Sequence, residues 1–202
     1  MTYSESDWVR ILTRLAAANV TVWAPLFARY LQPSSFSAGQ AEMAEFLGQV
    51  CHESRMLARL EENLNYSAPR LCEVWPGRFP TLASARPFEH NPRELAEKVY
   101  GRRMGNNLPG EGWLFRGRGL IQCTGRDNYR LVEDVTGLPV LSQPDLLTQP
   151  EVALRVSLAW WEKRVPDSAL GDTERVTRAV NGGTAGLEDR QKLTQLARKV
   201  LQ

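Results

Sequence analysis

The sequence has 202 residues, of which 43% are hydrophobic and 24% charged, with a net charge of +2. These are ordinary values for a globular chain with a buried core, so they exclude a disordered or fibrous protein. So small a charge would not drive nucleic-acid binding, and no run approaches the eighteen or so apolar residues of a membrane span. We therefore expect no nucleic-acid partner and no stable membrane association.

Hydrophobic periodicity predicts a mostly helical protein. Helices are expected from Ser4 onward, over residues 21–31, in the segment after Ser37, and over residues 92–100, 127–136, 151–164, 172–180 and 187–200. The segment 69–92 is rich in proline and aromatic residues, which predicts ordered loops or short helices. Residues 101–112 are irregular, and residues 114–124 carry the only strand signal, which predicts a short hairpin at most.

Two capping patterns mark the expected starts of two of these helices. Ser4 with Asp7 forms a capping-box pattern before an apolar stripe, and Ser37 with Gln40 repeats it. The segment after Ser37 has a wide apolar face, which predicts a central, largely buried helix that ends near Glu53.

The N-terminus, the cysteines and the lack of linkers bear on compartment and domain organisation. Residues 1–10 are polar and acidic, so we expect no signal peptide and a protein made in the cytoplasm. Cys51, Cys72 and Cys123 are odd in number and irregularly spaced, which predicts free thiols. No repeat, low-complexity tract or linker divides the chain, so a single domain over residues 1–202 is expected.

Glu53 and Glu62 are the side chains most suited to chemistry. Paired carboxylates can cleave a glycosidic bond, one as proton donor and one as activator of water. In one continuous helix they would point in opposite directions, about 13 Å apart, so the chain must turn between them if both serve one site. Asn63 and Asn65 make a bend near the second glutamate plausible, and the adjacent Glu61 competes for its role.

Other chemistries are poorly supported by the residue inventory. His52 and His90 are the only histidines, and no His-Glu-x-x-His motif occurs, so we expect no metal and no other cofactor. Tyr100, beside the irregular segment, is a candidate for stacking on a sugar ring, whereas a pair such as Trp160-Trp161 is more often core.

Residues 115–129, Phe-Arg-Gly-Arg-Gly-Leu-Ile-Gln-Cys-Thr-Gly-Arg-Asp-Asn-Tyr, resemble the aromatic-x-Gly-Arg-Gly-x-Ile-Gln signature of glycoside hydrolase family 19. That family contains plant-type chitinases and many bacteriophage endolysins. His-Glu-Ser at 52–54 and Glu-Asn-Leu-Asn-Tyr-Ser-Ala at 62–68 are similar to its endolysin branch, and Asn-Gly-Gly at 181–183 resembles a C-terminal element. The resemblance covers about residues 41–191.

The resemblance implies a fold and a mechanism. The fold would be mainly α, lysozyme-like and two-lobed, with a substrate groove. Glu53 would be the general acid and Glu62 the general base, with Thr124 holding the attacking water, and the reaction would invert the anomeric centre. The substrate-binding candidates are His52, Tyr100, Gln122, Asn128, Asn181 and Arg190. We expect burial at the helix end to keep the acid protonated, and a solvated loop to keep the base ionised.

The leading hypothesis is an endolysin that hydrolyses bacterial peptidoglycan as a monomer. The spacing between Glu53 and Glu62 is shorter than in plant chitinases, which implies an open groove for a peptide-substituted glycan. Such an enzyme would be made in the host bacterial cytoplasm and act in the periplasm or on the wall after release. The alternatives are a chitinase, a lytic transglycosylase and a catalytically decayed wall-binding protein.

Overall fold

The computed structural model describes residues 2–202, and within them it is helical, with no β-sheet. The α-helices are α1 (Glu5–Arg14), α2 (Val20–Tyr30), α3 (Gly39–Glu53), α4 (Ala68–Val74), α5 (Leu82–Ala85), α6 (Pro92–Tyr100), α7 (Glu111–Leu114), α8 (Arg126–Thr136), α9 (Pro150–Arg164), α10 (Thr173–Asn181) and α11 (Leu187–Val200). Four 3-10 helices join them: η1 (Pro33–Ser35), η2 (Arg86–Phe88), η3 (Pro144–Thr148) and η4 (Asp167–Ala169). The expected mainly α class is confirmed.

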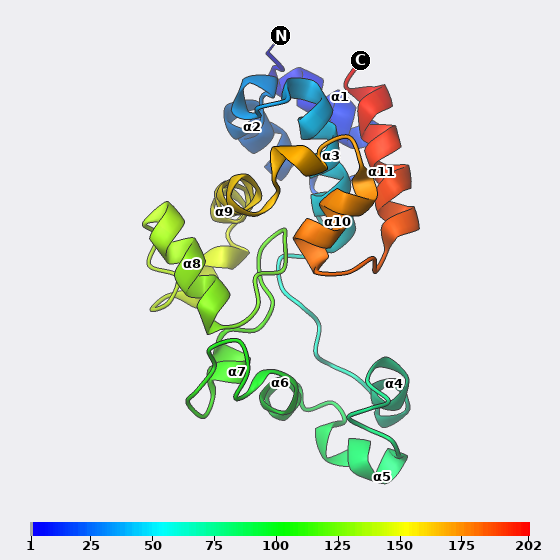
Figure 1. The fold of residues 1–202 in the computed structure, drawn as a ribbon, viewed down its shortest axis with the longest axis vertical. Coiled ribbons are helices and arrows are strands. Elements are labelled where there is room, and N and C mark those ends of the chain that lie inside the picture. The colour runs from blue at the N-terminus through cyan, green and yellow to red at the C-terminus, as the bar shows by residue number, and fades with distance from the viewer. Residues whose placement is uncertain (1) are drawn as a thin grey trace.

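The helices form two lobes (Figure 1). The large lobe contains α1–α3 and α9–α11 around a core that includes Trp8, Trp23 and Trp161. The small lobe contains α4–α6 around Leu71, Phe79 and neighbouring apolar residues. A third apolar cluster lies beneath α8 and η3. The two-lobed arrangement expected from the sequence is therefore confirmed.

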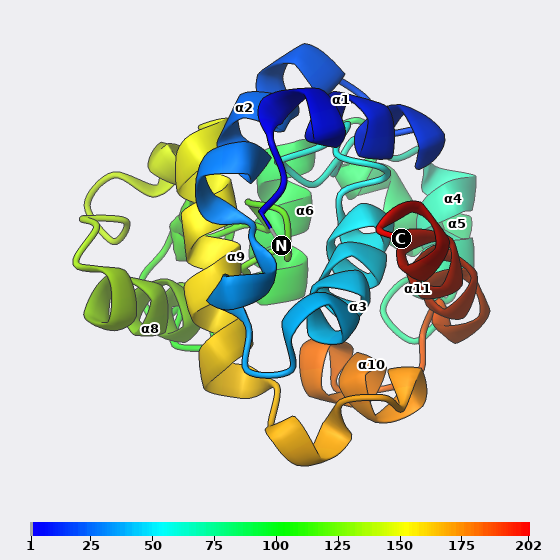
Figure 2. The same ribbon diagram turned by 90° about the horizontal axis from the view of Figure 1, so that it is seen from above.

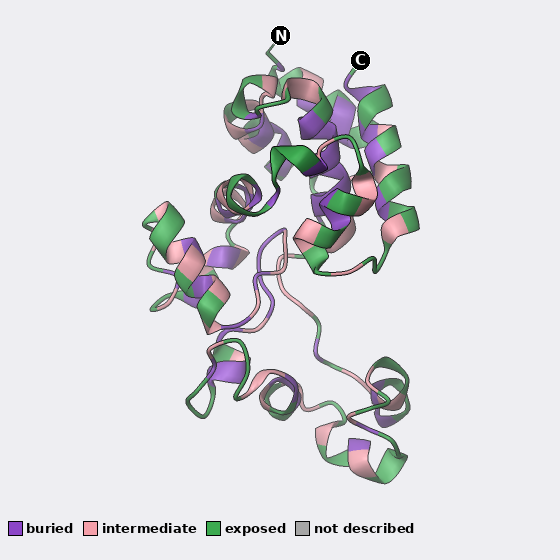
Figure 3. Cartoon of the chain, viewed as in Figure 1, coloured by how far each residue is buried: buried purple, intermediate pink, exposed green. Residues whose placement is uncertain are grey.

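Helix α3 is the centre of the large lobe. Seen from above, it lies inside a ring made by α1, α2, α9, α10 and α11 (Figure 2). Every residue from 42 to 51 is buried, and buried residues are concentrated on this helix (Figure 3). Gly48 permits close packing, because a Cβ there would overlap the Thr194 side chain of α11. The expected central buried helix is thus confirmed.

Of the two predicted helix caps, the structure contains the cap of α1 and lacks the cap of α3. Ser4 and Asp7 form the predicted capping box of α1. The second pattern is wrong, because neither Ser37 nor Gln40 caps α3. Instead the buried Glu42 carboxylate accepts hydrogen bonds from the Ser37 hydroxyl and the Ala38 N–H, both at 3.0 Å. A carboxylate inside the first turn therefore stabilises the helix start.

The segments between the two lobes follow the weaker sequence patterns. The proline-rich region forms α4, α5 and η2, and the predicted helix over 92–100 is α6 with the same bounds. Residues 114–124 form a tight hairpin closed by an isolated bridge between Arg118 and Cys123. A second bridge joins Arg118 to Glu61, in the segment after α3. This hairpin reaches toward the segment that follows α3, and it brings the signature motif to the space between the lobes (Figure 1).

Candidate active site

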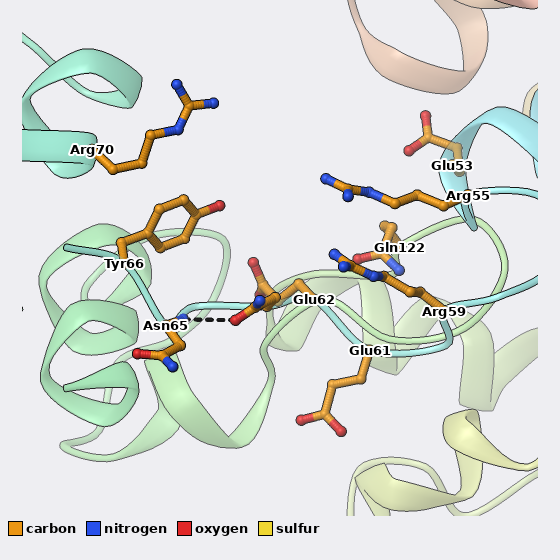
Figure 4. A pocket seen from close by; sticks show the side chains of 10 residues that line it. Glu53, Arg55, Arg59, Glu61, Glu62, Asn65, Tyr66, Arg70 and Gln122 are labelled. Atoms are coloured by element: carbon orange, nitrogen blue, oxygen red, sulfur yellow. Dashed lines mark hydrogen bonds between the residues drawn. The ribbon is translucent and has the colours of Figure 1, made fainter. Parts of the chain in front are cut away.

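A cleft of about 350 Å³ contains both predicted carboxylates. It is lined by Glu53, Arg55, Arg59, Glu61, Glu62, Asn63, Asn65, Tyr66, Arg70 and Gln122 (Figure 4). One wall is the end of α3 and the turn after it, and the other is the start of the small lobe. The chain therefore does turn between the two glutamates, as one shared site requires.

The turn lies directly after α3, which corrects the expected bend at Asn63 and Asn65. Arg55, Met56 and Leu57 have φ of 51°, 58° and 63°, so three successive non-glycine residues are left-handed. This conformation costs roughly 1–2 kcal/mol per residue. Asn63 makes only a local contact, because its side-chain oxygen accepts the Asn65 N–H at 2.8 Å.

Local hydrogen bonds and one from a distant helix hold this strained turn. The buried Ser54 hydroxyl donates to Val50 O at 2.6 Å and accepts the Leu57 N–H at 2.9 Å. The Met56 N–H donates to Cys51 O, and the Trp23 indole N–H donates to Leu57 O. Strain of this kind persists only where its surroundings over-determine it, and it is concentrated at functional sites.

Glu53 is the last residue of α3 and is held by a buried arginine of α11. The Arg190 guanidinium forms an ion pair with the Glu53 carboxylate. It also donates to Gln49 Oε1 at 2.6 Å and to Ala185 O at 3.2 Å, and its side chain is 2% exposed. Arg190 therefore fixes the direction of Glu53 and acts on the cleft through it.

Glu62 lies on an extended segment and accepts hydrogen bonds from two other parts of the chain. The Gly117 N–H donates to its Oε1 at 2.5 Å, and the Tyr100 hydroxyl donates to its Oε2 at 2.7 Å. Burial raises the pKa of Glu62, and these two hydrogen bonds oppose the rise. The expectation of a solvated base is wrong, because burial removes much of the water around the Glu62 carboxylate.

Glu61 and Glu62 point in different directions (Figure 4). Successive side chains of an extended segment alternate in direction. Glu61 forms an ion pair with Arg116, whereas Glu62 faces Tyr100 and Gly117. Glu62 is therefore the glutamate directed at the signature hairpin.

Three groups of the hairpin converge beside Glu62. A Cβ on Gly117 would lie 2.9 Å from Gln122 Oε1, 3.1 Å from Thr124 Oγ1 and 3.2 Å from Glu62 Oε1. The lack of a side chain at Gly117 thus lets these three oxygens approach its backbone closely. The Thr124 hydroxyl donates to Gln122 O at 3.0 Å, so its lone pairs can accept from a bound molecule.

His52, Asn128 and Asn181, also predicted to bind substrate, are not among the residues that line the cleft. His52 Nδ1 contacts Asp189 Oδ2 at 2.6 Å and packs against Gly186, so it links the end of α3 to α11. The Asn128 amide donates to Thr124 O at 2.7 Å and shapes the hairpin base. Asn181 is exposed at the end of α10, outside the residues that line the cleft.

Sequence reasoning missed three arginines of the cleft, Arg55, Arg59 and Arg70. Arg55 lies in the unpredicted turn and Arg59 follows it, so neither belongs to a periodic pattern. For these two, nearness to the His-Glu-Ser motif was the available signal. Among residues 2–202, no three His, Cys, Asp or Glu side chains are grouped to hold a metal ion, and none of the helices has the length and apolar character of a membrane span.

Comparisons with known proteins identify related sequences and folds. No family model matches the chain. Over 154 residues, 75% of this chain and 76% of the relative, it is 36% identical to a glycosyl hydrolase family 19 domain-containing protein of Haemophilus influenzae. It is 36% and 37% identical to two endochitinases of Arabidopsis thaliana over 73% of this chain, but the match spans only 41% of each of them.

Solved structures share the fold. Chitinase C from Streptomyces griseus HUT6037 aligns with a TM-score of 0.59 and 18% identity, over 98% of this chain and 91% of that one. A bacterial family 19 chitinase aligns with a TM-score of 0.51 and 20% identity, over 96% of this chain and 94% of that one. At these identities the likeness shows a common helical architecture.

Proposed function

The chain belongs to glycoside hydrolase family 19, and we propose that it is an endolysin-type enzyme that hydrolyses β-1,4 bonds in bacterial peptidoglycan. The family relationship makes it a glycosidase of the chitinase-like group. The observation that supports the site is that Glu53 and Glu62, from separate segments, line one cleft, while Glu61 is directed elsewhere. Two carboxylates in one cleft are the equipment for acid–base hydrolysis of a glycoside.

We assign the general acid to Glu53 and the general base to Glu62. Arg190 pairs with Glu53 and holds it at the cleft wall, so substrate binding must loosen this ion pair and let Glu53 take up a proton before it can give one to the leaving oxygen. Glu62 removes a proton from water, and its raised pKa makes it a stronger base once ionised. Thr124 Oγ1 and Glu62 Oε1 both approach Gly117, so these two groups are near enough to hold one water between them. Direct attack by water inverts the anomeric centre.

Two side chains in contact with this site complete the proposed binding surface. Gln122 lines the cleft, so its amide is placed to hydrogen-bond a sugar. The Tyr100 hydroxyl already donates to Glu62, so Tyr100 orients the base. His52, Asn128 and Asn181 would act from the margins of the cleft by positioning α3, the hairpin and the end of α10.

Peptidoglycan digestion tests this proposal against its rivals. Purified sacculi should yield fragments with ordinary reducing ends in mass spectrometry, and the α-anomer should appear first by NMR, with or without EDTA. A 1,6-anhydro end would assign a lytic transglycosylase, and an initial β-anomer a retaining enzyme. Chitin hexamers are the second substrate to compare, because two relatives are named endochitinases. Cleavage of chitin alone would make the protein a chitinase.

We further propose that the protein acts as a monomer that leaves the host cytoplasm to reach the wall. Lysis should then follow expression only when the inner membrane has been permeabilised. Lysis by cytoplasmic protein behind an intact membrane would contradict this route.

A further inference from the structure

Arg55 and Arg59 extend from the turn after α3 into the cleft (Figure 4). Both are exposed, and within residues 2–202 neither side chain makes a hydrogen bond or an ion pair. They lie between the Glu53 wall and Glu62, on the same side of the cleft. Two guanidinium groups therefore face the space that a substrate would occupy.

The acids of the cleft already have other partners. Glu53 pairs with Arg190, and Glu61 pairs with Arg116. Glu62 accepts its hydrogen bonds from Tyr100 and Gly117. The charge of Arg55 and Arg59 is thus not matched by these acids. The third arginine of the cleft, Arg70, differs, because it forms an ion pair with Glu73, one helical turn away on α4.

The backbone at Arg55 is not one that its side chain favours. Its φ of 51° lies in the region that glycine occupies at least cost. The Arg55 side chain is exposed, so it contributes little core packing in return. A long cation at this strained position is therefore better explained by a ligand than by the fold.

We propose that Arg55 and Arg59 form a carboxylate-binding subsite beside the two glutamates, which selects anionic glycans over neutral ones. Guanidinium groups bind carboxylates through paired, charge-assisted N–H···O bonds. Peptidoglycan supplies such carboxylates on the lactyl ether of free muramic acid and on its stem peptides, whereas chitin is uncharged. The inference rests on the proposed function and names the feature of the glycan that is recognised.

Matched substrates test the subsite. Soluble peptidoglycan strands, intact or stripped of peptides, are compared with the same strands after their carboxylates have been converted to methylamides. For the wild type, the amides should raise KM by about tenfold or more, the usual scale for a charged hydrogen bond. For Arg55→Gly/Arg59→Ala, the ratio of the two KM values should fall to near one. If amidation raises KM only for the intact strands, the subsite binds the stem-peptide carboxylates. If amidation also raises KM for the stripped strands, it binds the lactyl carboxylate.

The controls separate charge, folding and function. Arg10→Ala/Arg14→Ala removes the same charge from α1 and should keep the wild-type KM ratio. Arg55→Gly relieves the left-handed strain, so thermal unfolding should show a folded protein, and Arg59→Ala alone should lower the ratio in part. A double variant that retains the wild-type ratio overturns the subsite.

Failure of the proposed function gives a different result. A wild type that cleaves chitin hexamers but no peptidoglycan strand refutes the peptidoglycan proposal. The subsite is then tested by inhibition. Stripped muramic acid strands should inhibit chitin cleavage by the wild type about tenfold more strongly than cleavage by the double variant, and equal inhibition overturns it.

Discussion

The large and the small lobe hold their carboxylates at the cleft in different ways. Among residues 2–202, the large-lobe core contains 26 buried apolar residues and the small-lobe core contains eight. Glu53 ends a helix of the large core and is paired with Arg190. Glu62 lies outside any helix, and hydrogen bonds from the hairpin and from α6 hold it. The position of Glu53 thus depends on the packing of the large lobe, and that of Glu62 on two long-range hydrogen bonds.

This difference also concerns charge. Glu53 has a cationic partner that is itself buried, so its carboxylate and Arg190 stabilise each other. Glu62 is desolvated and receives only neutral hydrogen-bond donors, so its carboxylate is held at some cost. Removing the charge should therefore affect the two sites alike in catalysis and oppositely in stability.

The largest effect should be on activity, where the two glutamates should behave alike. Glu53→Gln and Glu62→Gln should each lower kcat by about 10²–10⁴-fold, because each removes a proton-transfer group. Glu61→Gln, the matched control one position away, should be only mildly impaired, since its carboxylate pairs with Arg116. Turbidity loss of purified sacculi measures all three. A Glu61 variant weaker than the Glu62 variant would move the base to Glu61.

The next effect should be on stability and should be specific to the large lobe. Glu53→Gln should lower the free energy of unfolding by about 1–3 kcal/mol, because the buried Arg190 loses its charged partner. Glu174→Gln breaks the exposed pair with Arg178 and should cost less than about 1 kcal/mol. Urea unfolding at pH 7 compares them. Equal losses would show that Arg190 is satisfied by Gln49 and Ala185 alone.

A smaller effect tests the close packing beside Glu62. Gly117→Ala should reduce kcat about tenfold, since its Cβ would lie near 3 Å from oxygens of Gln122, Thr124 and Glu62 and would displace the proposed base. Gly77→Ala is the matched control, because a Cβ there would meet nothing within 4 Å. Wild-type kcat in the Gly117 variant would place the attacking water elsewhere.

The sequence predicts the helices of the large lobe well, because their apolar stripes are long and regular. The family resemblance, rather than the residue pattern, assigned both glutamates to one site. The turn at Arg55, Met56 and Leu57 could not be predicted, since none of these residues favours a positive φ and one of the bonds that hold it comes from the distant Trp23. The α3 cap failed for a related reason, because Glu42 supplies a contact that local propensity assigned to Gln40.

The electrostatics of the cleft were predicted least well. Burial of each glutamate depends on which segments cover it, and the sequence does not show that Tyr100 and Gly117 enclose Glu62. The solvated loop expected at Glu62 was therefore wrong. The family resemblance gave Arg190 as a substrate-binding candidate, whereas the structure buries its side chain and pairs its guanidinium with Glu53.

The smallest effect is the sharpest test of the comparison, because its sign should be opposite to that at Glu53. Burial raises the pKa of Glu62 above its ordinary value of 4.5. A group with a raised folded-state pKa contributes stability below its unfolded pKa, and that contribution is lost as the pH rises through the folded pKa. At pH 7 the ionised Glu62 therefore opposes folding. Glu62→Gln should be more stable than the wild type at pH 7, and this advantage should shrink as the pH falls from the raised folded-state pKa toward the ordinary value of 4.5. Urea unfolding of both proteins between pH 3 and pH 7 (roughly the range over which glutamates titrate) measures the difference. A variant less stable at pH 7, or a difference independent of pH, would mean that Tyr100 and Gly117 outweigh the burial of Glu62.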